Sequence, residues 1–164
     1  MDSTSIKDSL SAQQGREILL VEDSDADARL VRRSLQLAGV TNHLRHFAHG
    51  KEAMSYLMQA TQVAGKPAPS VFLLDLKLPG VNGFEILQWL QHHPEFSHSL
   101  KVVLSQLDQI DNIRKAYSLG AHSFLSKPFC QEDLHELITF YPDYWVLSQP
   151  AATDSLRSST LSRR

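Results

Sequence analysis

The sequence has little cysteine, no long apolar run and no excess of charge of either sign. Its one cysteine, Cys130, excludes an internal disulfide and fits a reducing compartment. No apolar run approaches the roughly 18 residues of a membrane-spanning helix, and the polar residues 1–15 lack the apolar segment of a signal peptide. A net charge of -2 gives no electrostatic case for nucleic acid or an anionic membrane. We therefore expect a cytoplasmic protein that binds neither.

The apolar residues occur in an alternating pattern of short runs and helically spaced sets. Hydrophobic residues make up 42% of the 164 residues, enough for one packed domain. The strand-length runs are 17–21, 44–47, 71–74, 100–104 and 123–126. A helically spaced pattern follows each run, the last two over about 108–119 and 131–140. Five alternating strand–helix units predict an α/β fold, a doubly wound parallel sheet with helices on both faces.

The composition changes at both ends of the chain. Residues 1–15 are rich in Ser and Gln, and residues 148–164 are rich in Ser, Thr and Arg, with little in either segment to bury. We expect an N-terminal disordered tail over 1–15, a folded domain over 16–147 and a C-terminal disordered tail over 148–164.

Polar side chains follow the predicted strands where each of them ends. Glu22 and Asp23 follow the first strand, Asp75 the third, Ser105 the fourth and Lys127 the fifth. Open α/β sheets bind their ligands at the edge formed by these strand ends. An acid after a strand is also an ordinary turn residue, so each position alone has a structural explanation. Their convergence from four strand ends favours a functional site.

Three carboxylates at one edge of a sheet repel one another, and a divalent cation would relieve that repulsion. Oxygen ligands without a nearby cysteine favour Mg²⁺ or Mn²⁺ over zinc. Such a cation can bind a phosphoryl group and make Asp75 a nucleophile. The acyl phosphate would then be held by the cation, the Lys127 ammonium and the Ser105 hydroxyl.

Four stretches together resemble the receiver domain of two-component response regulators. They are Leu19–Asp23, Asp75–Gly83, Ser105 and Lys127–Phe129, within a region of resemblance over roughly 16–141. The resemblance implies a flavodoxin-like (β/α)5 fold with strand order 2-1-3-4-5. It also implies a signalling switch rather than an enzyme, with only its own phosphotransfer and autodephosphorylation as chemistry.

The resemblance assigns roles around the phosphoacceptor. Asp75 would accept a phosphoryl group from a phosphohistidine of a sensor histidine kinase. Asp23, Asp75 and the backbone carbonyl of Lys77 would hold Mg²⁺, with Glu22 assisting through water. Lys127 would pair with the phosphoryl oxygens.

The resemblance also implies a conformational switch in two residues. The Ser105 hydroxyl would move toward the phosphate, and the Phe124 ring would turn inward. Gln106 departs from the family pattern, because a small residue usually follows the switch hydroxyl. We expect Gln106 to influence how long Asp75 stays phosphorylated.

The end of the chain bears on its partners. The loop 61–70 and the end of the chain soon after the fifth helix are similar to stand-alone regulators that partner bacterial phytochrome-type kinases. No DNA-binding motif follows, so we expect output by protein contact or onward phosphotransfer. The aromatic residues at 140, 141, 144 and 145 either fold back on the core or form a contact. One hypothesis is a homodimer through the fourth helix, fifth strand and fifth helix.

Other interpretations fit the sequence less well. An aspartyl-phosphate phosphatase of the haloacid-dehalogenase type needs a second Asp two positions after its nucleophile, where this chain has Lys77. A degenerate receiver that serves only for docking remains an alternative, but all the acidic positions and Lys127 are present. A metal site at His43, His46 and His49 is disfavoured, because successive residues of a strand face opposite sides and residues three apart therefore do not converge.

Overall fold

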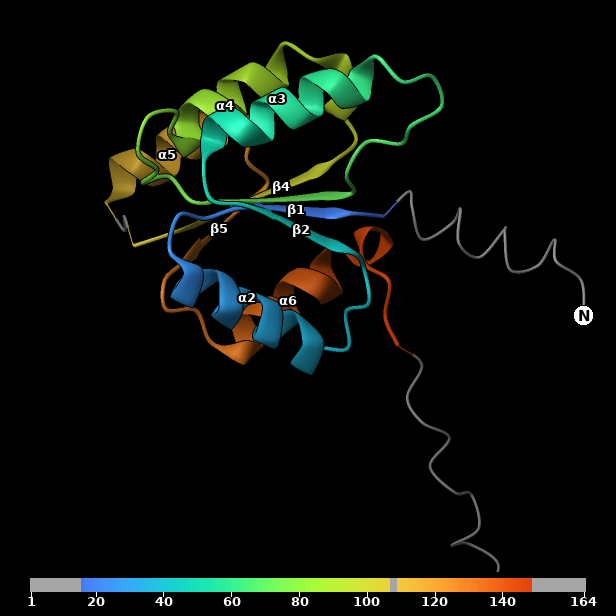
Figure 1. Ribbon diagram of the computed structural model, residues 1–164. Helices are drawn as coiled ribbons and strands as arrows, with labels where there is room; N and C mark the ends of the chain where they lie inside the picture. The colour runs from blue at the N-terminus through green and yellow to red at the C-terminus, as the bar shows by residue number, and fades with distance from the viewer. Residues whose placement is uncertain (1–15, 107–108, 149–164) are drawn as a thin grey trace, which may run out of the picture.

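Five parallel strands form the centre of the computed structural model, which describes residues 16–106 and 109–148 (Figure 1). The strands are β1 (Ile18–Val21), β2 (Leu44–Phe47), β3 (Val71–Leu74), β4 (Leu100–Ser105) and β5 (Ser123–Ser126). Their order in the sheet is β2-β1-β3-β4-β5, which confirms the predicted fold class and strand order. Strand β2 lies at one edge of the sheet, and all four of its residues are half-buried.

Helices cover both faces of the sheet (Figure 1). They are α2 (Asp25–Leu37), α3 (Gly50–Thr61), α4 (Gly83–Gln91), α5 (Ile110–Ser118) and α6 (Gln131–Phe140), with short 3₁₀ turns η1 (Pro94–Phe96) and η2 (Pro142–Tyr144). Helices α3, α4 and α5 lie on one face, and α2 and α6 lie on the other. The expected tails lie mostly outside the described residues. Ser148 is described, and its backbone N–H donates to the Gly39 carbonyl at 2.7 Å.

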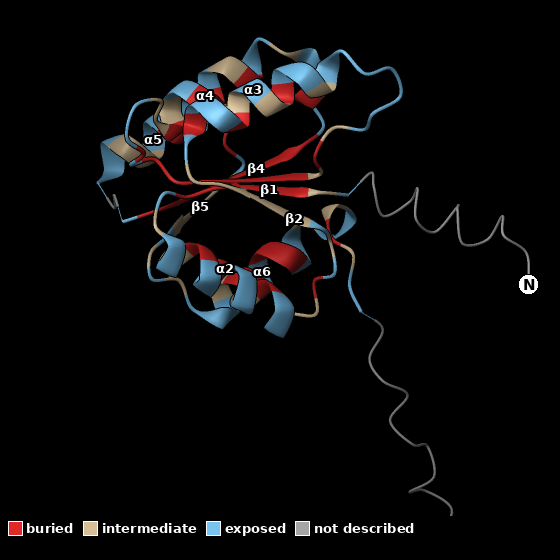
Figure 2. Cartoon of the chain, in the orientation of Figure 1, coloured by how far each residue is buried: buried red, intermediate tan, exposed pale blue. Residues whose placement is uncertain are grey.

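The core is divided by the sheet into two apolar layers, seen as buried strands and buried inner helix faces in Figure 2. Successive residues of β1 belong to opposite layers, as the pleat requires. Ile18 and Leu20 pack toward α2 and α6, whereas Leu19 and Val21 pack toward α3, α4 and α5. Because both faces of the central strands are covered, these strands read as continuous apolar runs in the sequence.

Two helix caps stand at the edge of the sheet where the strands end. The Ser24 hydroxyl accepts a hydrogen bond from the Asp27 N–H at 3.2 Å at the start of α2. The Asn82 side chain accepts from the Glu85 N–H at 3.0 Å at the start of α4. A side-chain cap satisfies a backbone donor that the first turn leaves free, so it holds the helix start in place. Both caps fix helix starts beside the predicted site.

The segment after α6 folds back onto the loop between α2 and β2. The Thr41 N–H donates to the Val146 carbonyl at 2.7 Å, and the Val146 N–H donates to the Asn42 side-chain oxygen at 2.6 Å. An isolated antiparallel bridge joins Val40 and Leu147. These contacts fasten residues 142–148 to the loop between α2 and β2.

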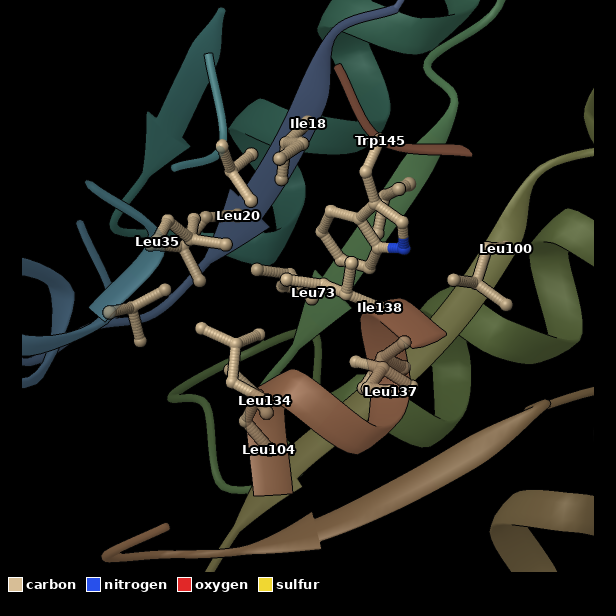
Figure 3. Packing of buried hydrophobic residues seen from close by; sticks show 14 of the residues in the cluster. Ile18, Leu20, Leu35, Leu73, Leu100, Leu104, Leu134, Leu137, Ile138 and Trp145 are labelled. Carbon is tan, nitrogen blue, oxygen red and sulfur yellow. The ribbon is translucent and has the colours of Figure 1, made fainter. Parts of the chain in front are cut away.

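The C-terminal aromatic residues have different environments. Trp145 is only 4% exposed and packs in the cluster that contains Ile18, Leu73 and Ile138 (Figure 3). Its indole Nε1–H is buried and has no hydrogen-bond partner. Phe140, by contrast, is 81% exposed. Trp145 therefore belongs to the core of its own domain, and Phe140 is left on the surface.

Within residues 16–106 and 109–148, no helix combines the length and the apolar character that crossing a membrane requires.

Candidate functional site

The predicted acidic residues lie together at the edge of the sheet formed by the carboxyl ends of the strands, called here the carboxyl edge. The Asp75 N–H donates to the Val21 carbonyl and the Glu22 N–H donates to the Phe47 carbonyl, both at 3.0 Å. Strand pairing thus continues one residue past β1 and β3 and fixes both acids. One carboxylate oxygen from each of Glu22, Asp23 and Asp75 lies within 4.8 Å of the others. The three acids, predicted to follow two different strands, converge.

Lys127 supplies positive charge to this acidic cluster. Its Nζ donates to Asp75 Oδ2 at 3.0 Å and to Asp27 Oδ2 at 3.2 Å, and it also bonds to Glu22 Oε2. Its side chain is 9% exposed, so these charge-assisted contacts are shielded from water. The Lys127 backbone N–H donates to the Ser105 carbonyl at 3.0 Å and so anchors the loop after β5 to β4.

Asp27 was not among the residues predicted from the sequence. It lies in the first turn of α2, three positions after the Ser24 cap. The start of this helix adjoins the carboxyl edge, because α2 follows β1 after a short turn. The position of Asp27 in the first turn of α2 was the one sequence signal that it lies near the site. An acid in a first helical turn is also explained by its favourable interaction with the helix dipole, so this signal did not distinguish a functional role.

The charges of this cluster shift the pKa values of its members. Burial raises the pKa of Glu22 to about 7, and the nearby negative charge of Asp75 adds to the rise. The hydrogen bond from Lys127 opposes this rise without cancelling it. Burial alone would lower the pKa of Lys127, but its hydrogen bonds to Glu22 and Asp75 outweigh burial and raise it. Lys127 is therefore a permanent cation, whereas Glu22 titrates near neutral pH.

The loop that follows Asp75 is held close to its carboxylate. The Lys77 backbone N–H donates to Asp75 Oδ1 at 3.0 Å, while the Lys77 side chain is exposed. Gly83, the first residue of α4, packs directly on this turn. A Cβ at Gly83 would lie 2.3 Å from the Asp75 carbonyl oxygen, so a larger residue would displace the acceptor loop. Gly80 has a φ of +75°, a conformation that glycine adopts without strain.

The predicted switch residues lie in β4 and β5. Ser105 is fully buried at the end of β4. Phe124 is half-buried in β5, opposite Val103, and packs on the layer covered by α3, α4 and α5. Gln106 is exposed and lines a groove of about 430 Å³ together with Lys127, Asp27 and residues of α2. Ser105 and Gln106 therefore flank Lys127 from the β4 side.

The histidines of the second strand region serve other contacts. His46 Nε2 lies 2.7 Å from the Glu22 carbonyl oxygen, an acceptor, so this ring nitrogen carries the proton. His43 lies 3.4 Å from a carboxylate oxygen of Glu17, and His49 is the N-cap residue of α3. The His46 contact was not predicted from the sequence. It fixes the backbone of one acid of the cluster.

The donor set at the carboxyl edge suits a hard divalent cation. It consists of carboxylate oxygens from Glu22, Asp23 and Asp75, and no cysteine is part of it. Mg²⁺ and Mn²⁺ prefer such oxygen ligands and keep open positions for water or phosphate. The single positive charge of Lys127 does not balance the three carboxylates, so the cluster keeps a net negative charge. A bound divalent cation would compensate this remaining negative charge.

We expect the affinity for a divalent cation to fall as the pH decreases through about 7, because Glu22 must lose its proton to help bind the ion. Below the pKa of Glu22, affinity should fall by up to about tenfold per pH unit, the limit for release of one proton. Titration calorimetry with Mg²⁺ between pH 6 and 8 measures this slope. In Glu22→Gln the slope should flatten, and an unchanged slope in that variant would contradict the assignment.

Comparison with known proteins finds the receiver domain of response regulators and relatives that are similar over most of their length. The model of the response regulator receiver domain matches residues 18–139. A probable methanogenesis regulatory protein, FilR2, from Methanothrix harundinacea (strain 6Ac) is 35% identical over 139 residues, which cover 85% of this chain and 89% of that protein. Response regulator Rcp1 from Synechocystis sp. (strain ATCC 27184 / PCC 6803 / Kazusa) is 33% identical over 137 residues, covering 82% and 93% respectively.

Two solved structures resemble the fold closely. The Mn²⁺-bound form of Rcp1 has a TM-score of 0.64 and 32% identity, with 83% of this chain and 99% of that chain covered. The phosphorylated cyanobacterial phytochrome response regulator RcpA has a TM-score of 0.65 and 30% identity, with 82% and 99% covered.

Proposed function

Because this chain belongs to the response regulator receiver domain family, we propose that Asp75 is its phosphoacceptor and that phosphorylation of Asp75 switches the protein between two signalling states. The observation that carries the proposal is the contact of Lys127 with Asp75 inside the acidic cluster. A buried nucleophile with a fixed ammonium beside it is suited to phosphoryl transfer, which depends mainly on positioning and charge neutralisation.

The chemistry uses the Asp75 carboxylate as a nucleophile. One of its oxygens forms a bond to phosphorus while the bond from phosphorus to the histidine nitrogen of the donor kinase breaks, which leaves an acyl phosphate. Lys127 already bonds to Asp75 Oδ2 and stabilises the added negative charge. The Lys77 N–H holds the other oxygen, Oδ1, and so orients the carboxylate before reaction. Hydrolysis of the acyl phosphate by water releases inorganic phosphate and restores the carboxylate, and the protein needs no other catalytic activity.

A divalent cation completes the site. Asp23, Asp75 and the Lys77 carbonyl would hold Mg²⁺ or Mn²⁺, with Glu22 assisting through water. When bound, the cation supplies charge neutralisation for the phosphoryl oxygens. Support comes from the carboxylate donor set and from the Mn²⁺-bound form of the relative Rcp1.

The switch would connect the phosphate to Phe124 in β5, which pairs with Val103 of β4. The buried Ser105 hydroxyl adjoins Lys127 through the backbone pairing of these two residues. Movement of this hydroxyl toward the phosphate would vacate space on the layer where Phe124 packs. Gln106 beside Lys127 is placed to affect the access of water to the acyl phosphate and hence its lifetime.

The expected partner is a sensor histidine kinase in the cytoplasm. A kinase of the phytochrome type is favoured by the similarity to RcpA, whose structure is that of a phytochrome response regulator. We propose signalling by protein contact rather than by direct binding of DNA.

We further propose a homodimer through α5, β5 and α6, with the exposed ring of Phe140 at its margin. Sedimentation velocity at tens of micromolar, with and without beryllofluoride, tests this proposal. A dimer that is weakened by Phe140→Ala supports it. A monomer under both conditions contradicts it.

The direct test of the function is intact-mass spectrometry after incubation with acetyl phosphate and Mg²⁺. A species heavier by one phosphoryl group is expected, and chelation of the Mg²⁺ should prevent its formation. If no such species forms with Mg²⁺ present, the proposed function fails.

A further inference from the structure

A lysine lies inside β4, at the end of the sheet opposite Asp75. Lys101 is the second residue of this strand and is 6% exposed. Its neighbours Leu100 and Val102 are fully buried, so an apolar residue is the ordinary choice at this position. Burying an ammonium is costly unless a charge of opposite sign accompanies it.

The described residues supply Lys101 with neutral partners. Its Nζ donates to the Phe96 carbonyl at 2.8 Å and to the Ser99 carbonyl at 3.2 Å. An ammonium has three N–H donors, so one remains beyond these two contacts. In the ranges 16–106 and 109–148, no carboxylate forms an ion pair with this ammonium. This differs from Lys127, which three carboxylates surround.

Two imidazoles lie beside this lysine. His122 Nδ1 accepts a hydrogen bond from the Lys101 backbone N–H at 3.0 Å, which places the ring proton on Nε2. His93 Nδ1 lies 2.7 Å from the Trp89 carbonyl oxygen and donates to it, and the His93 ring stacks on the Trp89 ring. Burial and the positive charge of Lys101 lower the pKa of His122. The neutral His122 ring therefore has one N–H donor, on Nε2.

Lys101, His93 and His122 line one pocket of about 250 Å³, which Leu90, Gln91 and Gly120 help to enclose. One water occupies about 30 Å³ of liquid volume, so the pocket has room for a small ion and several waters. Its walls offer hydrogen-bond donors from the ammonium and from imidazole. A pocket with a buried cation and no carboxylate partner is complementary to an anion.

We propose that this pocket binds a small oxyanion, a phosphate or carboxylate group, whose charge is matched by Lys101. The site is separate from the carboxyl edge, because Lys101 lies at the amino end of β4 and Ser105 at the carboxyl end. The anion would accept from the remaining N–H of Lys101 and from the imidazole of His122. The proposal does not depend on phosphorylation of Asp75.

The test is a ¹⁵N-edited NMR titration of the full chain without divalent cations. Sodium phosphate is added in one arm and sodium acetate in the other, with sodium chloride keeping the ionic strength constant. We expect saturable shifts of the Lys101 and His122 amide signals in at least one arm. In Lys101→Met the apparent Kd should rise by about tenfold or more, the effect of losing one charge-assisted hydrogen bond.

The variants are chosen so that folding does not obscure the result. Methionine has a similar length and no charge, so the buried position should accept it. Lys66→Met removes an exposed lysine from the loop after α3 and should bind like the parent chain. Saturation by phosphate alone assigns a phosphate group, and saturation by acetate alone assigns a carboxylate; saturation by both assigns small oxyanions in general.

Three results would overturn the proposal. They are shifts that fail to saturate in both arms, an equal affinity in Lys101→Met, and saturable shifts confined to the signals of residues at the carboxyl edge.

Discussion

Asp75→Asn is expected to abolish phosphorylation of this chain by acetyl phosphate. Asparagine has the shape of aspartate, but its amide cannot attack phosphorus to form an acyl phosphate. After incubation with Mg²⁺, intact-mass spectrometry should show only the unmodified variant, whereas the parent chain gains one phosphoryl group. The loss should be complete, because no other acid of the cluster bonds to both Lys127 and the Lys77 N–H.

The fold of this variant should persist. Removing one negative charge relieves repulsion among Glu22, Asp23 and Asp75, and Lys127 keeps its contacts with Glu22 and Asp27. The matched control is Asp143→Asn, which alters an exposed acid in η2 and should phosphorylate like the parent chain. A phosphorylated species in Asp75→Asn would assign the phosphoacceptor to another residue.

Trp145→Ala should lower the free energy of unfolding by about 3–5 kcal/mol, the range for truncating a buried aromatic side chain to alanine. The indole packs in the layer between the sheet and α6, in the cluster with Leu73 and Ile138 (Figure 3). Urea unfolding followed by circular dichroism measures the change. Phosphorylation of the folded variant should continue, because Trp145 lies away from the carboxyl edge.

Phe140→Ala is the control for Trp145→Ala, since it removes an aromatic ring from the same region that is 81% exposed. Its unfolding free energy should change by no more than about 0.5 kcal/mol, as for surface substitutions in general. Trp145→Phe should cost less than Trp145→Ala, because it keeps a ring and removes an N–H that has no partner. Equal losses for Trp145→Ala and Phe140→Ala would contradict the assignment of Trp145 to the core.

The elements that could be predicted from sequence are those with local signals. The run Val71–Leu74 is apolar throughout and is followed by the turn formers Pro79 and Gly80. These local signals predicted a strand over 71–74, and β3 has the same bounds. The predicted bounds of the second strand, the fifth strand and the last helix also agree with the structure. The first strand begins at Ile18 rather than at Glu17, whose side chain instead bonds to Arg45 and Tyr56.

The acidic site was predictable because parallel strands bring their carboxyl ends to one edge. Contacts that depend on how helices and loops pack in the folded structure could not be predicted from the sequence. The bond from Lys127 to Asp27 requires the orientation of α2, and the pairing of Val146 with Thr41 joins segments more than a hundred residues apart. Lys101 reads in sequence as one polar residue in an otherwise apolar strand. Only the packing of η1 and β4 shows that its ammonium is buried.

The two tryptophans, Trp89 and Trp145, should differ in their fluorescence. Trp145 is enclosed in one apolar layer without a hydrogen bond to its indole, so little solvent relaxation is available around its excited state, and its emission should lie toward the blue. Trp89 lies in the other layer with its ring 3.8 Å from that of His93, a contact that provides a route for quenching. The native fluorescence should therefore come mainly from Trp145. Its colour would report directly, without a label, whether the segment after α6 is docked.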